Sequence, residues 1–274
     1  MSSEADRIAE LERLTDPGGA TGSAAPPIST TTWTYFNSTR TATYGFLAAL
    51  PLFVIYEFGI LLANSGQMMS IRVGADIWLK RLLAWFGGTG WMALGVAVMI
   101  IGGVIYWAER NNRPPIVPRY FGLIIGESAI YAIVLAFIVG GVVGLLFGVW
   151  AAPEAMLQPM QRLGLPHQLA LSIGAGLYEE IVFRVILVGG LFLFVHRFLP
   201  KRTTAYLIAA VIGAFIFSLV HYMGPMGDPF RFSSFTFRFL FGLALNGVFL
   251  VRGFAMAAWT HALYDVFVVT GGFG

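Results

Sequence analysis

The chain has 274 residues, of which 57% are hydrophobic and 11% are charged, with a formal net charge of +3 and no cysteine. Ordinary globular proteins are roughly 25% charged, so the composition excludes a soluble domain and a disordered chain and favours a lipid bilayer as the solvent. The lack of cysteine excludes disulfides, thiolate zinc sites and a thiol nucleophile. The small positive charge gives no reason to expect a nucleic-acid partner.

Residues 1–42 differ from the rest of the chain. Ile8, Leu11 and Leu14 recur at helical spacing among acidic residues, which favours a short amphipathic helix. A stretch rich in glycine, alanine, proline, serine and threonine follows, from 17 to about 32, and is typical of a flexible linker. We therefore expect residues 1–42 to form a flexible cytoplasmic tail and linker.

Seven apolar runs follow, and a membrane-spanning helix needs about 20 such residues. They are too long for tilted strands, so we expect an all-α, polytopic bundle of about seven spans, within a range of six to eight. A shorter segment, 77–86, contains Lys80 and Arg81 among apolar residues, which is typical of a helix lying in the membrane interface. The third run could be one tilted helix or a helix with a re-entrant piece. The expected runs are 43–64, 90–107, 120–150, 167–199, 205–223, 234–251 and 254–270.

The positions of the apolar runs predict the domain boundaries, and the basic residues in the loops predict the orientation of the protein in the membrane. We expect the first two spans and the interfacial helix to occupy 43–119, and a catalytic membrane domain to occupy 120–274. Eight basic loop residues fall on one side of a seven-span bundle and five on the other, which favours a cytoplasmic N-terminus. We expect an integral, multi-pass protein of a bacterial inner or plasma membrane.

The fourth run contains charges that apolar packing does not explain. Glu179, Glu180 and Arg184 lie in one hydrophobic stretch, where ionisable groups are costly and usually functional. Arg184 follows Glu180 by four residues, so the two share a helical face and can pair. Glu179 points about 100° away and lacks that partner, which suits a general base. In the same run, the spacing of Ser172 and Gly176 predicts a close approach to a neighbouring helix.

Two later runs add histidines. The fifth run ends with Phe217 and His221, and the seventh contains His261 and Asp265, which share one helical face. A single membrane histidine is usually a helix contact, but two of them together with the acidic pair predict one converging polar site.

These three motifs, EExxxR at 179–184, FxxxH at 217–221 and HxxxD at 261–265, occur in order on successive hydrophobic runs. Together they resemble the CPBP (ABI-domain) family, which contains the type II CAAX prenyl endopeptidases and bacteriocin-processing relatives, over about 120–270. The resemblance implies an intramembrane endopeptidase in which Glu179 activates water with help from His221. It also implies that His261 and Asp265 stabilise the oxyanion, while Glu180, Arg184 and Phe217 organise the site.

Asp265 departs from the prenyl-protease pattern, in which asparagine occupies this position. A charged carboxylate cannot donate a hydrogen bond to an oxyanion. Asp265 could therefore be protonated, orient His261 as the acid of a triad does, or bind a metal. We favour a reaction without a cofactor, and the alternative is a zinc ion held by Glu179, His221, His261 and Asp265.

Further polar residues lie within the apolar runs. Glu57, Tyr178 and Asn246 are candidates for substrate contact or for a secondary polar role. Glu57 and Glu127 could each also pair with Arg238 or Asn246.

The expected partners are a membrane-anchored or membrane-delivered peptide or protein and the bilayer itself. One competing hypothesis is a proton- or ion-coupled transporter that uses the same glutamate and histidine groups. Another is a family member that has lost catalysis and serves as a scaffold.

Overall fold

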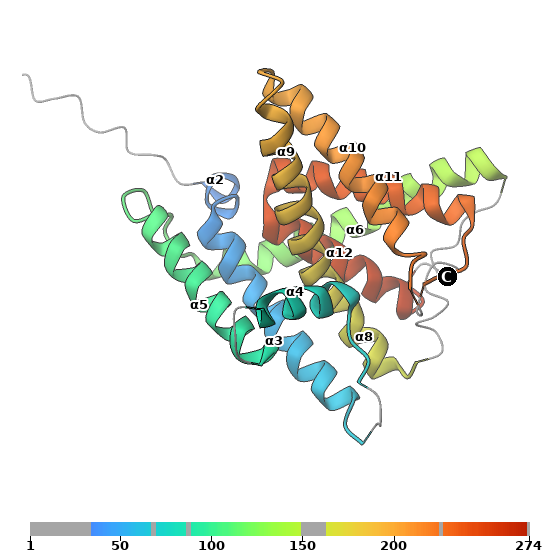
Figure 1. Cartoon of the computed structure of the whole chain (residues 1–274), viewed down its shortest axis with the longest axis horizontal. Coiled ribbons are helices and arrows are strands. Elements are labelled where there is room, and N and C mark those ends of the chain that lie inside the picture. The colour runs from blue at the N-terminus through green and yellow to red at the C-terminus, as the bar shows by residue number, and fades with distance from the viewer. Residues whose placement is uncertain (1–33, 67–69, 86–88, 149–162, 225–226, 273–274) are drawn as a thin grey trace, which may run out of the picture. The chain divides into compact units, whose positions relative to one another are not determined.

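The computed structural model describes residues 34–66, 70–85, 89–148, 163–224 and 227–272, and every regular element in these ranges is helical. The fold is therefore all-α, as composition and run length predict. The expected tail helix and linker lie almost entirely outside the described residues. The elements are α2 (Tyr35–Thr39), α3 (Ala42–Ala63), α4 (Gly74–Ala84), α5 (Gly90–Ala108), α6 (Pro118–Phe147), α8 (Leu165–Gly174), η3 (Ala175–Glu179), η4 (Ile181–Val188), α9 (Gly189–His196), α10 (Arg202–Val220), α11 (Phe232–Arg252) and α12 (Phe254–Val269) (Figure 1).

Four of these helices, α3, α6, α10 and α11, are long and apolar enough to cross a membrane, and two shorter apolar helices span 92–108 and 254–269. Over its described residues the third run is one 30-residue helix, α6, which begins at Pro118, ends at Phe147 and is capped by Gly148. Pro118 suits a first helical position because its missing N–H has no partner there. Together the helices define an integral membrane protein, while the expected number of seven spans stays a prediction.

Helix boundaries follow from local sequence. The side chain of Thr41 accepts a hydrogen bond from the Tyr44 amide and caps α3. Gly253 alone separates α11 from α12, and its φ of +87° lies in a region that side chains disfavour. The last two helices are therefore joined by a single-residue corner.

Helix α12 is the centre of the described bundle, because it packs against α3, α6, α8, η3 and α11. Its alanines allow these close approaches. One buried cluster joins α3, the α4 region, η3 and α12, and a second joins α6, α11 and α12. Large apolar side chains elsewhere are exposed, such as Phe58, Leu145 and Leu193, as a lipid-facing surface requires.

The fourth run is not the regular α-helix that the spacing argument assumed. Residues 175–179 and 181–188 have π-helical hydrogen bonding, between the α-helical segments α8 and α9. Segments of this kind are rare and occur frequently at functional sites. Glu179 is therefore the last residue of the first π-helical segment, and Glu180 lies between the two segments.

Candidate active site

The three motifs occupy three helical segments that meet at one place. Glu179 ends η3, His221 caps the C-terminus of α10, and His261 lies in the middle of α12. Glu179 Oε2 lies 3.9 Å from His221 Nε2 and 3.9 Å from His261 Nε2. These separations are too long for direct hydrogen bonds, and a water molecule could bridge Glu179 Oε2 to either ring. The side chains of Glu179 and His221 keep 17% and 24% exposure, while the Oε2 atom of Glu179 is itself buried and has no hydrogen-bond partner among the described residues.

Glu180 and Arg184 form a buried ion pair beneath Glu179 and the histidines. Arg184 Nη1 lies 2.9 Å from Glu180 Oε1, and the two side chains are 1% and 0% exposed. The pairing expected from their four-residue spacing is thus present despite the π-helical turns. The same carboxylate oxygen of Glu180 lies 2.7 Å from His261 Nδ1. Glu180 therefore links the guanidinium to the histidine.

Phe217 contacts both Arg184 and His221. Its ring lies under the Arg184 guanidinium, 4.5 Å from centroid to Cζ, a favourable cation–π arrangement. Its carbonyl oxygen accepts a 2.7 Å hydrogen bond from His221 Nδ1. Because a carbonyl can only accept, Nδ1 of His221 carries the proton and Nε2 of a neutral ring presents its lone pair toward Glu179.

Asp265 lies at the edge of the group, with Oδ2 3.7 Å from His261 Nε2. This separation is longer than a hydrogen bond. The carboxylate that bonds to the ring of His261 belongs instead to Glu180, at Nδ1. Of the two carboxylates, it is therefore Glu180 and not Asp265 that is hydrogen-bonded to His261 in this structure.

Donor chemistry at the site suits zinc, since carboxylates and imidazoles are common zinc ligands. The donor atoms of Glu179, His221, His261 and Asp265 lie 3.7–3.9 Å apart along the measured pairs. Ligands of tetrahedral zinc at 2.0–2.1 Å lie roughly 3.3 Å apart, so these atoms are spread more widely. Among the residues that the structure describes, no group of three or more His, Asp and Glu meets the geometry of a metal site.

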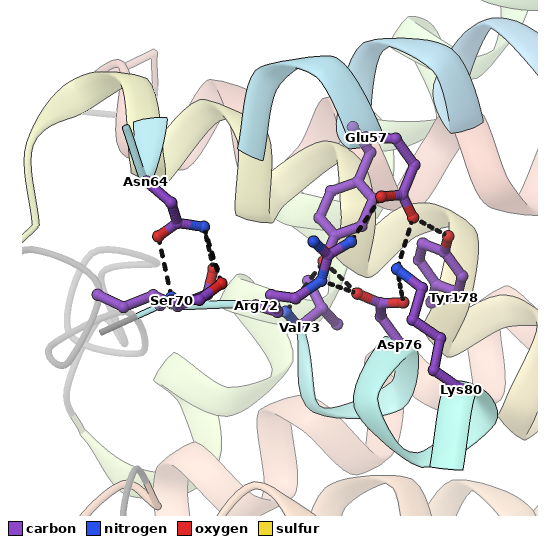
Figure 2. Close-up of polar contacts among 10 residues, drawn as sticks. Glu57, Asn64, Ser70, Arg72, Val73, Asp76, Lys80 and Tyr178 are labelled. Atoms are coloured by element: carbon purple, nitrogen blue, oxygen red, sulfur yellow. Dashed lines mark hydrogen bonds and ion pairs between the residues drawn. The ribbon is translucent and has the colours of Figure 1, made fainter. Parts of the chain in front are cut away.

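A second polar cluster lies beside the first and contains two of the predicted secondary residues (Figure 2). Glu57 accepts hydrogen bonds from Arg72 at 2.6 Å, Lys80 at 2.8 Å and the Tyr178 hydroxyl at 2.6 Å. The expectation that Glu57 pairs with Arg238 or Asn246 is wrong. Its cations come from α4 and the segment before it, where the spacing of Arg72, Asp76 and Lys80 was the available signal.

Lys80 lies on α4, within the segment that we expect to form a helix in the membrane interface. Its ammonium points inward and also pairs with Asp76 at 2.7 Å. The amphipathic pattern of this segment thus reflects a buried ion network on one side and exposed Trp78 and Leu82 on the other.

The other predicted polar residues lie outside the site. Asn246 donates through Nδ2 to the Ala210 carbonyl at 2.9 Å, which is a helix–helix contact. Glu127 pairs with Arg252 at 2.7 Å, so the expected pairing with Arg238 or Asn246 is wrong here too. Arg238 is bound to Asp228, in the segment that follows His221.

An apolar groove of about 680 Å³ borders the helix that carries Glu179. This volume is within the range of ligand pockets, roughly 300–1,000 Å³. Leu177, Tyr178 and Ile181 form one wall, and residues of α3 and α5 such as Ala49 and Ala97 form others. Sequence reasoning did not detect the groove, because its lining is distributed over separate apolar runs.

Part of the chain matches a known protein family. Residues 161–267 match the model of the Rce1-like family, described as type II CAAX prenyl endopeptidase Rce1-like. All three motifs fall within this segment, so the resemblance that they suggested is confirmed over it, although the match begins later than 120. None of the curated proteins and none of the solved structures gave a match. At the level of the family, the match supports an intramembrane protease of the CAAX type.

Proposed function

We propose that the protein is an intramembrane endopeptidase that hydrolyses a peptide bond of a membrane-anchored or membrane-delivered peptide or protein. The observation that carries the proposal is the position of Glu179 Oε2, which lies 3.9 Å from both His221 Nε2 and His261 Nε2. A buried, unpartnered carboxylate oxygen that lies between two imidazoles belongs to the kind of group that general acid–base hydrolysis needs.

The first step assigned to this geometry is the activation of water. Glu179 takes a proton from the water, and His221 Nε2, whose lone pair faces the same point, accepts the other hydrogen bond. The hydroxide oxygen then forms a bond to the carbonyl carbon, and the π electrons of the carbonyl become the oxyanion. When the C–N bond breaks, Glu179 returns its proton to the leaving amine.

His261 is the proposed partner of the oxyanion. Its Nδ1 donates to Glu180, and its Nε2 lies among Glu179 and Asp265, so carboxylates face it from three directions. A lone pair at Nε2 would be repelled there, whereas an imidazolium is stabilised. With a proton on both ring nitrogens, His261 can donate Nε2–H to the oxyanion, and Asp265 balances its charge.

Two versions of the mechanism predict different responses to chelators. We favour water activation by Glu179 and His221 alone, since the donor atoms are spread more widely than zinc ligands. In the zinc version, Glu179, His221, His261 and Asp265 hold the ion, which lowers the pKa of its bound water.

The apolar groove supports a substrate with a hydrocarbon part. Its wall includes Leu177 and Tyr178, the residues directly before Glu179, so a chain bound there would lie next to the helix that carries the base. The matched family is described as a prenyl endopeptidase, and an isoprenoid anchor is the chemistry we assign to the groove. We further propose a bacterial inner or plasma membrane and a cytoplasmic N-terminus.

Glu179→Gln tests the proposal. The protein, reconstituted in liposomes with a library of prenylated and unmodified peptides, is assayed by mass spectrometry. General-base catalysis contributes about 10²–10⁴-fold, and we expect a loss of at least that size. Glu109→Gln is the matched control, because Glu109 bonds to the amides of Ala42 and Thr43, away from the motifs.

Near-normal turnover by Glu179→Gln would refute the proposed base. Ion flux into the same liposomes that depends on His221, without any peptide cleavage, would favour the transporter instead.

A further inference from the structure

The π-helical segment η3 ends at Glu179 and is held on several sides. A Cβ at Gly174 would lie 2.3 Å from the ring of Tyr56, and one at Gly176 would lie 2.5 Å from Ala262 Cβ. The segment is therefore packed directly against α3 and α12, with no room for a side chain at either glycine. The close approach that the spacing of Ser172 and Gly176 predicted is confirmed at Gly176.

Tyr178 adds the polar contact to this packing. Its side chain is 1% exposed, and its hydroxyl donates a 2.6 Å hydrogen bond to Glu57 Oε1 on α3. It is the residue immediately before Glu179, so its side chain fixes the backbone from which the proposed base extends.

Glu57 is itself fixed by a balanced network (Figure 2). Two carboxylates, from Glu57 and Asp76, face two cations, from Arg72 and Lys80, at distances of 2.5–2.8 Å. The hydroxyl of Tyr56 joins the network by donating to Asp76 at 2.8 Å. Each of these side chains is at most 14% exposed. A buried network that is fully paired is rigid, so Glu57 is a firm anchor for the Tyr178 hydroxyl.

A π-helical register needs such an anchor. Turns of this kind are uncommon because the α-helical alternative bonds better, and uncommon backbone states persist only where surroundings fix them. A return of residues 175–179 to α-helical bonding would rotate every following side chain about the axis. Glu179 would then leave its position between His221 and His261.

We propose that Tyr178 and Glu57 are positioning residues, whose hydrogen bond keeps η3 in its π-helical register and so aims Glu179 at the two histidines. This inference rests on the proposed function, because the aim matters only if Glu179 is the base. The ion network around Glu57, which joins α3 to α4 and the segment before it, thus acts on the site through Tyr178.

The experiment compares Tyr178→Phe and Glu57→Leu with Tyr131→Phe in the full-length protein. Tyr131→Phe is a matched control, since Tyr131 also donates a 2.6 Å hydrogen bond to a glutamate that an arginine pairs, here Glu127 and Arg252. In Tyr178→Phe, Glu57 keeps Arg72 and Lys80, so no buried carboxylate loses all its partners.

Two readouts are used. Misplacement of a catalytic group by about 1 Å can cost about 10²-fold, so we expect kcat of Tyr178→Phe to fall by roughly that factor with KM within about twofold. We also expect faster amide hydrogen exchange in peptides covering 172–188 of Tyr178→Phe. The control should match the wild type in both.

The double variant separates one shared bond from two independent effects. Glu57→Leu with Tyr178→Phe should lower kcat no further than the worse single variant, because leucine has no acceptor and both changes therefore remove the same hydrogen bond.

Several results would overturn the inference. They are unchanged exchange in Tyr178→Phe, whatever the activity; unchanged kcat; an equal loss in Tyr131→Phe; or additive losses in the double variant. Hydrolysis by the wild type that does not depend on Glu179 would instead overturn the proposed function, and the exchange measurement keeps the two failures apart.

Discussion

Replacement of Arg184 by methionine should show how much the buried Glu180–Arg184 pair contributes to the free energy of unfolding. Arg184 and Glu180 are 1% and 0% exposed, and their ion pair is 2.9 Å long. Removal of one partner from such a pair leaves a buried charge and typically costs about 3–5 kcal/mol. The lost stacking on Phe217 adds about 0.5–2 kcal/mol. We therefore expect Arg184→Met to lose about 3.5–7 kcal/mol of unfolding free energy.

The double variant Glu180→Gln with Arg184→Met removes both charges at once. Replacement of a whole buried pair by neutral groups of similar volume is often close to neutral, so most of the lost stability should return. Glutamine retains a side-chain oxygen that can accept from Nδ1 of His261. Activity should nevertheless stay low, since the imidazolium proposed for His261 would lose its carboxylate.

The assay is denaturant-induced unfolding in detergent micelles, followed for the wild type, both single variants and the double variant, alongside peptide cleavage. The reasoning predicts that stability recovers in the double variant while cleavage does not. If Arg184→Met is as stable as the wild type, or if the double variant is less stable than Arg184→Met, the buried pair does not act as described.

Other predictions concern the cofactor, the packing and the substrate. Treatment with EDTA should leave cleavage unchanged, and a loss that zinc restores would establish the metal version. Gly176→Val should prevent accumulation of folded protein, because a Cβ at position 176 would lie 2.6 Å from the Ala258 carbonyl oxygen. The control Gly190→Ala should accumulate normally in membrane fractions, because a Cβ at position 190 would have no neighbour within 4 Å. Ala97→Phe narrows the groove and should raise KM about tenfold for a prenylated peptide but not for its unmodified form; equal KM values would remove the groove from substrate binding. Asp265→Asn should keep cleavage within about tenfold of the wild type and Asp265→Leu should not, and equal rates would show that no polar group is needed there.

Local spacing predicted much of the site. Four-residue separations identified the Glu180–Arg184 contact, and the order of three motifs on separate apolar runs indicated one family, because both signals depend only on chain periodicity. The same periodicity predicted that Arg184 pairs with Glu180, and the structure shows that pair. The π-helical turns did not follow from it, since the packing of Tyr56 and Ala262 against two glycines is a tertiary constraint.

Partners across the bundle were harder to predict. The expected pairings of Glu57 and Glu127 with Arg238 or Asn246 failed, because any cation in the sequence can satisfy a buried carboxylate once the fold brings it near. The cations that do so, Arg72 and Lys80 for one and Arg252 for the other, lie just outside the apolar runs. Attention to charges at run boundaries would have included them.

The corner at Gly253 has a consequence for how the sequence can change. One residue joins α11 to α12, so the connection has no further loop residues that could accommodate an insertion or deletion. Each added residue would turn the last helix by about 100° relative to its predecessor and carry His261 away from its neighbours. Evolution can therefore lengthen other connections in this bundle more freely than this one, and a homologue of altered length at the corner should have lost hydrolysis.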